Sequence, residues 1–163
     1  MKEKHPMTQA IRVLQKSGVP FELMTYAYEE RGGTRVSARE LGVEEHVVIK
    51  TLIMQTEEKP SLPLVVLMHG DREVSTKELA RILRVKGVAP CAPKEADKYS
   101  GYHVGGTSPF GTRRKMEVYA ESTIRTLSEI YINAGSRGLL AKMNPLDLEK
   151  LLPIHWVAIS RCD

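Results

Sequence analysis

The chain has 163 residues, of which 42% are hydrophobic, and its formal net charge at pH 7 is +4. This length suits one domain with its own hydrophobic core, and no stretch reaches the apolar length of a membrane span. The modest positive charge is compatible with a nucleic-acid partner but does not by itself indicate one. Since the N-terminal residues are charged rather than apolar, we expect a cytoplasmic protein that forms a single domain over residues 1–163.

Cys91 and Cys162 are the two cysteines of the sequence. There is no Cys-x-x-Cys pair and no cysteine–histidine cluster, so the sequence argues against a structural zinc site and against a disulfide framework. We expect both side chains to be reduced thiols.

In chain order, the first predicted elements are a helix over residues 8–16 and a strand over residues 21–26. The next segment, 29–35, is charged and contains two adjacent glycines, so we expect a surface loop. Ser37 and Ser75 each begin a Ser-x-x-Glu pattern, which is the spacing of a capping box. Each pattern predicts that a helix starts at its serine.

Between those two helices, residues 47–54 and 64–68 are two apolar, β-rich runs joined by a polar turn, and they predict a β-hairpin. A helix of one or two turns is expected after Pro93. Three more strands and a final helix are predicted at residues 116–120, 129–133 and 139–143 and from Asn144 onward. Because strands and helices do not alternate strictly, we predict a mixed α/β (α+β) fold, with a β-barrel-like mixed sheet and surrounding helices.

Lys50 is the first candidate functional residue. It lies inside the apolar run 47–54, where desolvating an ammonium group is costly unless the site needs the charge. The alternative is a lysine on an edge strand whose side chain extends to solvent. The sequence alone leaves both interpretations open.

The glycine-rich segment 101–111 is the second candidate. It begins with a strand-like pair, Tyr102 and Val104, and it contains four glycines, the hydroxyls of Thr107 and Ser108, and Pro109. Glycines let backbone N–H groups approach a ligand, and the proline restricts the loop. The segment lacks the spacing of a P-loop or of a dinucleotide-binding loop. It therefore predicts a site for a polar or anionic group, with an ordinary β-turn as the alternative.

Two weaker candidates lie beside this segment. His103 is a possible ligand contact, although none of the five histidines shows the spacing of a metal site. The basic run 113–115 would meet phosphates if the loop binds a ligand, but such runs are more often solvated surface. Ser108 has no visible histidine and aspartate partners, so a serine-hydrolase triad is not indicated.

Three blocks of the sequence, in this order and at this spacing, resemble the YbaK / prolyl-tRNA synthetase-associated editing domains. The blocks are Lys50-Thr51-Leu52, the glycine-rich segment 101–111 and Asn133-Ala134-Gly135-Ser136-Arg137-Gly138-Leu139. The resemblance covers nearly the whole chain, and the glycine-rich segment is most similar to that of the free-standing YbaK-type members.

The resemblance implies a trans-editing deacylase that hydrolyses the ester of mischarged aminoacyl-tRNA, with Cys-tRNA(Pro) the favoured substrate and Ala-tRNA(Pro) the next. It implies that Lys50 is the catalytic residue and that no metal or other cofactor takes part. The implied partners are aminoacyl-tRNA and prolyl-tRNA synthetase, and no membrane. The implied substrate-binding residues are Tyr26, Gly105, Gly106, Thr107, Ser108, Pro109, Asn133 and Gly135.

Two positions depart from the family pattern. Many YbaK-type members have serine in place of Asn133 and an acidic residue in place of Leu140, so the amino acid and the tRNA that are edited stay open. The alternative to an enzyme is a non-catalytic tRNA- or synthetase-binding module on the same fold. A hydrolase of small aminoacyl esters is a third interpretation.

Overall fold

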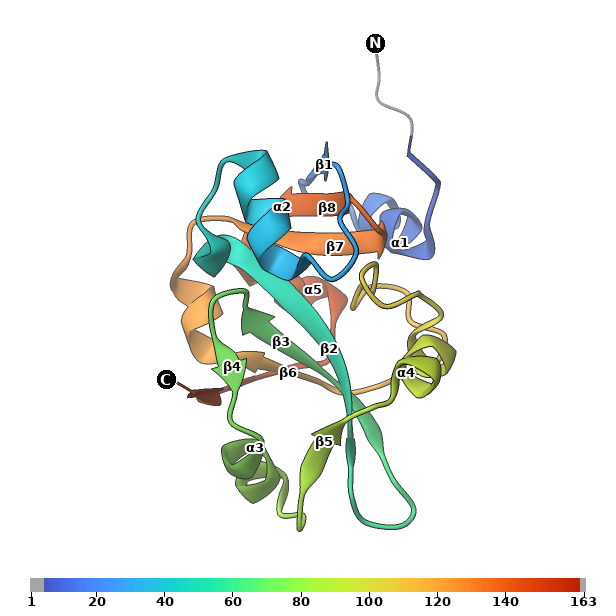
Figure 1. Cartoon of the computed structure of the whole chain (residues 1–163), viewed down its shortest axis with the longest axis vertical. Helices are drawn as coiled ribbons and strands as arrows, with labels where there is room; N and C mark the ends of the chain where they lie inside the picture. Colours follow the sequence, from blue (N-terminus) through green and yellow to red (C-terminus); the bar gives the residue numbers. More distant parts are fainter. Residues whose placement is uncertain (1–4, 162–163) are drawn as a thin grey trace.

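The computed structural model describes residues 5–161, which form a large mixed sheet surrounded by short helices (Figure 1). The α-helices are α1 (Gln9–Ser17), α2 (Gly33–Leu41), α3 (Thr76–Leu83), α4 (Pro93–Ser100) and α5 (Leu148–Leu151). The 3-10 helices are η1 (Glu45–Val47), η2 (Ser122–Thr126) and η3 (Pro145–Asp147). The strands are β1 (Glu22–Thr25), β2 (Val48–Thr56), β3 (Pro63–His69), β4 (Glu73–Val74), β5 (Val88–Pro90), β6 (Val118–Glu121), β7 (Ile130–Ser136), β8 (Leu139–Met143), β9 (Ile154–Val157) and β10 (Ser160–Arg161).

The large sheet has the order β1-β8-β7-β2-β3-β6-β9, and β5 pairs with the far end of β2. The β2–β3 hairpin at its centre is antiparallel, whereas β7 pairs with β2, and β6 with β3, in parallel. The predicted mixed sheet with surrounding helices is therefore confirmed, as is the predicted hairpin. A second, two-stranded sheet joins β4 and β10.

The two faces of β2 contact different parts of the core. Ile49 and Ile53 belong to the main apolar cluster, which includes Phe110 and buried residues of α1. On the opposite face, Val48 packs in a small cluster with α2, and Met54 packs in another with α3. Since side chains alternate along a strand, Lys50 lies on this second face, between the two clusters.

Two local predictions are wrong. Ser37 does not begin a helix: α2 starts four residues earlier, and the Ser37 hydroxyl donates to the Thr34 carbonyl (3.0 Å) within it. A serine inside a helix can make this backward bond, so the capping-box spacing alone does not fix a helix start. The pair Tyr102 and Val104 is not a strand but part of an irregular loop, because the Tyr102 ring is buried and its hydroxyl donates to the Phe110 carbonyl.

Other local predictions are confirmed. The Ser75 hydroxyl accepts from the Glu78 N–H (3.2 Å) and so caps α3, and Asn144 caps η3 by accepting from the Leu146 N–H (2.9 Å). Cys91 is a free, buried thiol, and Cys162 lies outside the described residues. No helix within residues 5–161 is long and apolar enough to cross a membrane.

Candidate functional site

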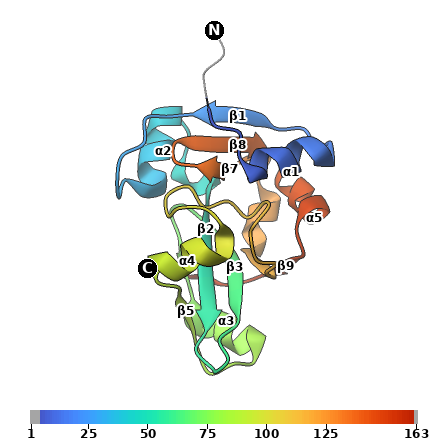
Figure 2. The ribbon, with the colours of Figure 1, turned by 90° about the vertical axis from the view of Figure 1, so that its right-hand side faces the viewer.

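A cleft of about 610 Å³ opens beside the middle of β2. Its other walls come from the segment after β1, from α2, from β5 and α4, and from the loop that follows α4. Figure 2 shows α4 and this loop in front of β2. The lining residues used below are Tyr26, Tyr28, Lys50, Thr51, Cys91, Val104, Gly105, Thr107, Asn133, Arg137 and Leu140.

One edge of β2 is open inside this cleft. Pairing with β7 ends at Ile49, and pairing with β5 begins at Met54. The Val48 carbonyl accepts from the Gly70 N–H (2.7 Å), so the even-numbered residues of β2 direct their backbone groups toward β3. The N–H and C=O of Thr51 therefore point to the open edge. Among residues 5–161, the buried Thr51 hydroxyl also has no hydrogen-bond partner. A ligand in the cleft can pair with the two backbone groups.

Lys50 is partly buried, with 19% of its side chain exposed, and it lies on a central strand rather than an edge strand. Its Nζ donates to the Arg72 carbonyl (2.5 Å) and lies 3.6 Å from Glu73 Oε1. An ammonium group has three N–H donors, so these two contacts leave one donor for a ligand in the cleft. The interpretation of Lys50 as a solvent-facing edge lysine does not fit this geometry.

The segment Val104–Ser108, called the glycine loop below, supplies a second wall. Gly105 and Thr107 line the cleft, whereas Gly106 packs against the backbone of the β7–β8 turn: an added Cβ would lie 2.8 Å from Arg137 N. Ser108 is fully buried, and its hydroxyl accepts from the Phe110 N–H (3.2 Å). Pro109 is buried and lines a smaller hollow behind the loop.

Asn133 ties the glycine loop to β7. Its Nδ2 donates to the Gly105 carbonyl (3.3 Å) and the Ser136 carbonyl (3.2 Å), and its Oδ1 accepts from the Gly135 N–H (2.7 Å). Gly135 does not line the cleft and acts through this turn. The amide of Asn133 is thus used almost completely to fix the loop.

Arg137 and Tyr28 complete this side of the cleft, and sequence reasoning did not select either as a site residue. Arg137 Nε donates to the Val104 carbonyl (3.0 Å), and its guanidinium lies over the Tyr28 ring at 5.3 Å from the ring centre. Arg137 stood inside the third sequence block, but its type gave no sign of this bridge. Arginine stacked on an aromatic ring keeps N–H donors for a phosphate or carboxylate.

Tyr26 and Leu140 form the apolar end of the cleft. Burial, followed by the nearby Tyr28, raises the pKa of the Tyr26 phenol and outweighs the opposing influences of Gly138 and Ser37. Leu140 is buried in the cluster with Val48 and Tyr131. This end of the cleft therefore holds a neutral hydroxyl and an alkyl side chain rather than a charged group.

The weaker candidates lie away from the cleft. The His103 side chain is 85% exposed and pairs with Asp97 at 3.3 Å. Arg113 and Lys115 border the smaller hollow rather than the cleft. In the part of the chain that the structure describes, no three histidine, cysteine or acidic side chains gather as a metal site would require.

Comparisons with known proteins show which family the sequence matches. The family model of the aminoacyl-tRNA editing domain matches residues 31–151. An Enterococcus faecalis protein, "Putative Cys-tRNA(Pro)/Cys-tRNA(Cys) deacylase EbsC", is 29% identical over 145 residues, which cover 88% of this chain and 87% of the relative. A proline–tRNA ligase of Limosilactobacillus fermentum is 24% identical over 63% of this chain, but this match spans 18% of the ligase.

The fold also matches solved structures. One, described as the "crystal structure of a putative trans-editing enzyme for prolyl tRNA synthetase", superposes with a TM-score of 0.83 at 17% identity, covering 97% of this chain and 100% of the other. At this identity the likeness concerns the fold alone.

Proposed function

Because the chain belongs to the aminoacyl-tRNA editing domain family, we propose that it is a trans-editing deacylase that hydrolyses the ester between a wrong amino acid and the 3′ end of a tRNA. Cys-tRNA(Pro) is the favoured substrate and Ala-tRNA(Pro) the next, as the EbsC relative suggests for the first. In this proposal residues 1–163 act as one domain in the cytoplasm.

One observation carries the proposal: the same cleft contains the restrained ammonium group of Lys50 and the backbone groups of Thr51 at the open edge of β2. Lys50 keeps one N–H donor for the substrate, and the Thr51 N–H points to the open edge of β2 in the same cleft. An ester carbonyl becomes an oxyanion when it is attacked, and fixed donors beside it lower that barrier. An aminoacyl ester is already activated, so orientation and electrostatic stabilisation suffice without a protein nucleophile.

Each wall of the cleft has a role in this mechanism. Lys50 polarises the ester carbonyl or anchors the terminal ribose or phosphate, and the glycine loop holds the terminal nucleotide through Gly105 and Thr107. Gly106, Ser108, Pro109 and Gly135 shape that loop and its support from behind rather than line the cleft. Water attacks the ester carbonyl and gives the free amino acid, or, when cysteine is the amino acid, its own thiol attacks and gives a cyclic thioester. The ester C–O bond breaks, and the proton lost by the water or the thiol restores the terminal hydroxyl of the tRNA.

Prolyl-tRNA synthetase is the partner we propose for tRNA selection. The support for this proposal is that the related segment of the Limosilactobacillus fermentum proline–tRNA ligase is part of a synthetase chain. The net charge of +4 supplies only a general, salt-dependent attraction to tRNA.

The test is a panel of mischarged tRNAs, incubated with the purified protein with and without prolyl-tRNA synthetase. We expect Cys-tRNA(Pro) to be deacylated fastest, with correctly charged Pro-tRNA(Pro) left intact. If every mischarged tRNA stays intact while a control deacylase clears the panel, the proposal fails. Tight tRNA binding without turnover would favour the non-catalytic module, and equal hydrolysis of free aminoacyl esters would favour a small-ester hydrolase.

A further inference from the structure

The turn that follows β3 lies directly over the Lys50 ammonium group. This turn, His69–Glu73, is called the lysine turn below. The Arg72 carbonyl accepts from Lys50 Nζ at 2.5 Å, and Glu73 Oε1 lies 3.6 Å from the same nitrogen. A lysine side chain has many rotamers, and a fixed carbonyl acceptor selects among them. The position of the Arg72 carbonyl therefore determines where the ammonium group lies.

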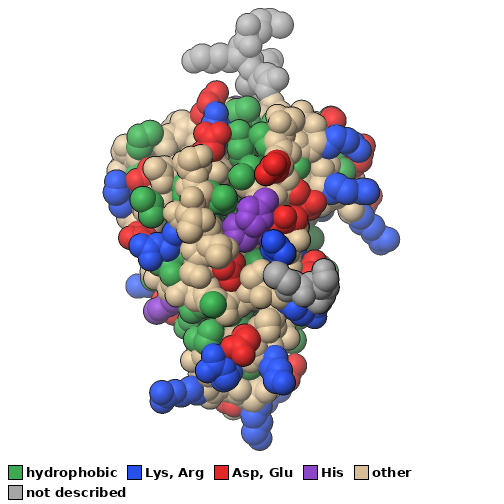
Figure 3. All heavy atoms as spheres, turned by 90° about the vertical axis from the view of Figure 1, so that its left-hand side faces the viewer, with side chains coloured by type: hydrophobic (Ala, Val, Ile, Leu, Met, Phe, Trp, Pro, Cys, Tyr) green, Lys and Arg blue, Asp and Glu red, His purple; other side chains and the backbone are tan. Residues whose placement is uncertain are grey.

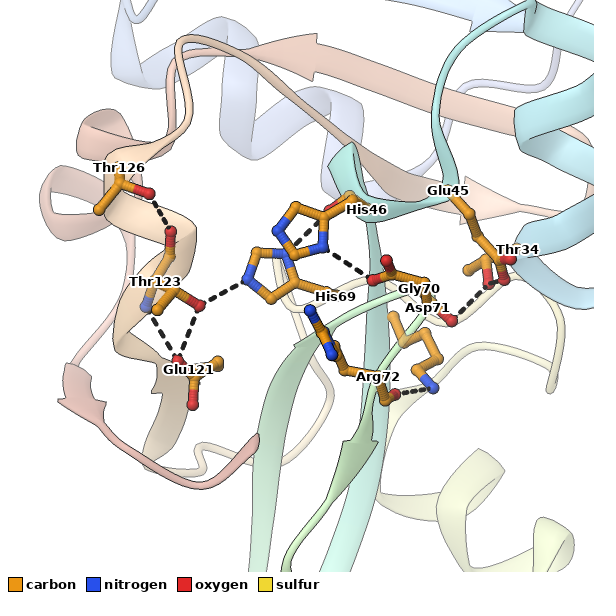
Figure 4. A network of polar contacts seen from close by, with 11 residues as sticks. Thr34, Glu45, His46, His69, Gly70, Asp71, Arg72, Glu121, Thr123 and Thr126 are labelled. Carbon is orange, nitrogen blue, oxygen red and sulfur yellow. Dashed lines mark hydrogen bonds and ion pairs between the residues drawn. The ribbon is translucent and has the colours of Figure 1, made fainter. Parts of the chain in front are cut away.

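The start of the lysine turn is locked by close backbone contacts. The Gly70 N–H donates to the Val48 carbonyl (2.7 Å), and an added Cβ on Gly70 would lie 2.7 Å from both the Glu45 carbonyl and Thr34 Oγ1. The Thr34 hydroxyl bonds to Glu45 Oε2 (2.6 Å). The first residues of α2 and η1 thus hold the turn from one side, as Figure 4 shows.

A histidine pair holds the middle of the lysine turn. His46 Nδ1 donates to Asp71 Oδ1 at 2.8 Å, and the His46 ring stacks on the His69 ring with centroids 3.8 Å apart. Partial burial alone would raise the pKa of Asp71, but the hydrogen bond and charge of His46, together with a backbone hydrogen bond and the charge of Arg72, lower this pKa. Asp71 is therefore the anchored carboxylate of the turn, one residue before the carbonyl that binds Lys50.

The buried ring of His69 extends this support across the molecule. His69 Nδ1 lies 2.8 Å from the His46 carbonyl, and Nε2 lies 2.7 Å from Thr123 Oγ1. The Thr123 hydroxyl donates to Glu121 Oε2 (2.8 Å). Figure 3 shows histidine surface near the middle of this face, beside acidic side chains. Four separate segments thus converge on a turn of five residues.

We propose that Asp71 and His46 are positioning residues for Lys50: their hydrogen bond fixes the lysine turn, so that the Arg72 carbonyl holds the ammonium group with its remaining N–H directed into the cleft. The proposal rests on the proposed deacylase function. Neither residue needs to touch the substrate, since neither lines the cleft. An alternative is that the pair merely stabilises the fold, and the test separates the two.

The kinetic arm compares Asp71→Ala with Asp71→Asn. Asparagine keeps an oxygen that accepts from His46 Nδ1, whereas alanine removes it. We expect Asp71→Ala to lower kcat about tenfold with KM within about twofold, because misplacing a reacting group mainly affects the transition state. Asp71→Asn should recover most of the rate. The matched control is Glu78→Ala, which breaks an exposed ion pair with Arg81 (2.8 Å). Neither residue of this pair contacts the lysine turn.

The second arm observes the ammonium group itself by ¹H–¹⁵N NMR, with the Lys50 signal assigned by its loss in Lys50→Ala. Asp71→Ala should shift or broaden this signal, while Asp71→Asn and Glu78→Ala leave it unchanged. An unmoved Lys50 signal in a folded Asp71→Ala variant would overturn the proposal. So would an unchanged kcat in that variant. The NMR arm needs no turnover, so failure of the positioning role and failure of the deacylase function give different results.

Discussion

The glycine loop and the lysine turn both serve the cleft, but different contacts hold them. The glycine loop lies against the β7–β8 turn through close backbone approach and through two side chains, Asn133 and Arg137. The lysine turn is held by side chains of four segments, including His46 and Thr123. Close backbone packing leaves no room for added atoms. In a hydrogen-bonded network, by contrast, a substitution removes one contact and the remaining contacts still stabilise the segment. The two supports should therefore fail differently under mutation.

The glycine loop should show the largest single effect. In Gly106→Ala the new carbon would lie 2.8 Å from Arg137 N and 2.9 Å from Ser136 C, which are backbone atoms that cannot rotate away. The loop must shift, and we expect kcat/KM to fall about 100-fold while the fold is kept. Deacylation kinetics and circular dichroism measure the two quantities.

Gly87→Ala is the matched control, because its new carbon would meet only the Glu57 side chain, outside the cleft. Near-normal activity of Gly106→Ala would show that the loop is not held by close approach.

Mutations in the hydrogen-bond network behind the lysine turn should mainly lower the free energy of unfolding. Glu121 is 2% exposed, its Oε1 accepts from the Ile159 and Ser160 N–H groups, and its Oε2 accepts from Thr123. In Glu121→Gln an amide NH₂ would face backbone donors, and we expect the free energy of unfolding at pH 7 to fall by about 2 kcal/mol. Urea unfolding measures this difference.

The same variant has a predicted pH dependence. Burial would raise the pKa of Glu121, but its four accepted hydrogen bonds hold that pKa below the ordinary 4.5. The carboxylate therefore stabilises the fold above pH 4.5, and this contribution is lost as the pH falls below that value toward the lowered pKa. The gap between wild type and Glu121→Gln should narrow on acidification. A constant gap would contradict the assignment.

Asn133 should have an intermediate effect, since it is the one side chain that ties the glycine loop to β7 by its amide. Asn133→Ala removes the bonds to Gly105, Ser136 and Gly135, and we expect KM to rise about tenfold. The control is Asn144→Ala, which loses a cap on η3 away from the cleft. Equal KM values for the two variants would show that Asn133 does not contribute to substrate binding.

The smallest effect is expected at the open edge of β2. Thr51→Val removes a buried hydroxyl that has no protein partner, so the free energy of unfolding should stay constant or rise by up to about 1 kcal/mol. The activity should stay near that of wild type, because this hydroxyl is buried and the Thr51 N–H at the open edge is unchanged. Thr56→Val, on the same strand, removes a hydroxyl that accepts from the Leu62 N–H and should destabilise the fold. A large loss of deacylation in a folded Thr51→Val variant would contradict this prediction and show that the substrate reaches the hydroxyl.

The difference between the two supports also explains what could be predicted from the sequence. Lys50 was visible as a charge in an apolar strand, and the glycine loop was visible because its unusual residues are adjacent. The role of Asp71 could not be predicted from the sequence, since its partner His46 is 25 residues away and neither residue lies in a motif. The β9 strand was missed because it is short, and its pairing with β6 arises only in the folded sheet.

The most direct test of the proposed function is the single-turnover rate of Cys-tRNA(Pro) deacylation by wild type and by Lys50→Ala, at equal concentration and with matching circular dichroism spectra. If Lys50 supplies the fixed cation of the cleft, the rate constant for Lys50→Ala should fall by about 100-fold or more. A folded Lys50→Ala variant that deacylates as fast as wild type would contradict the account.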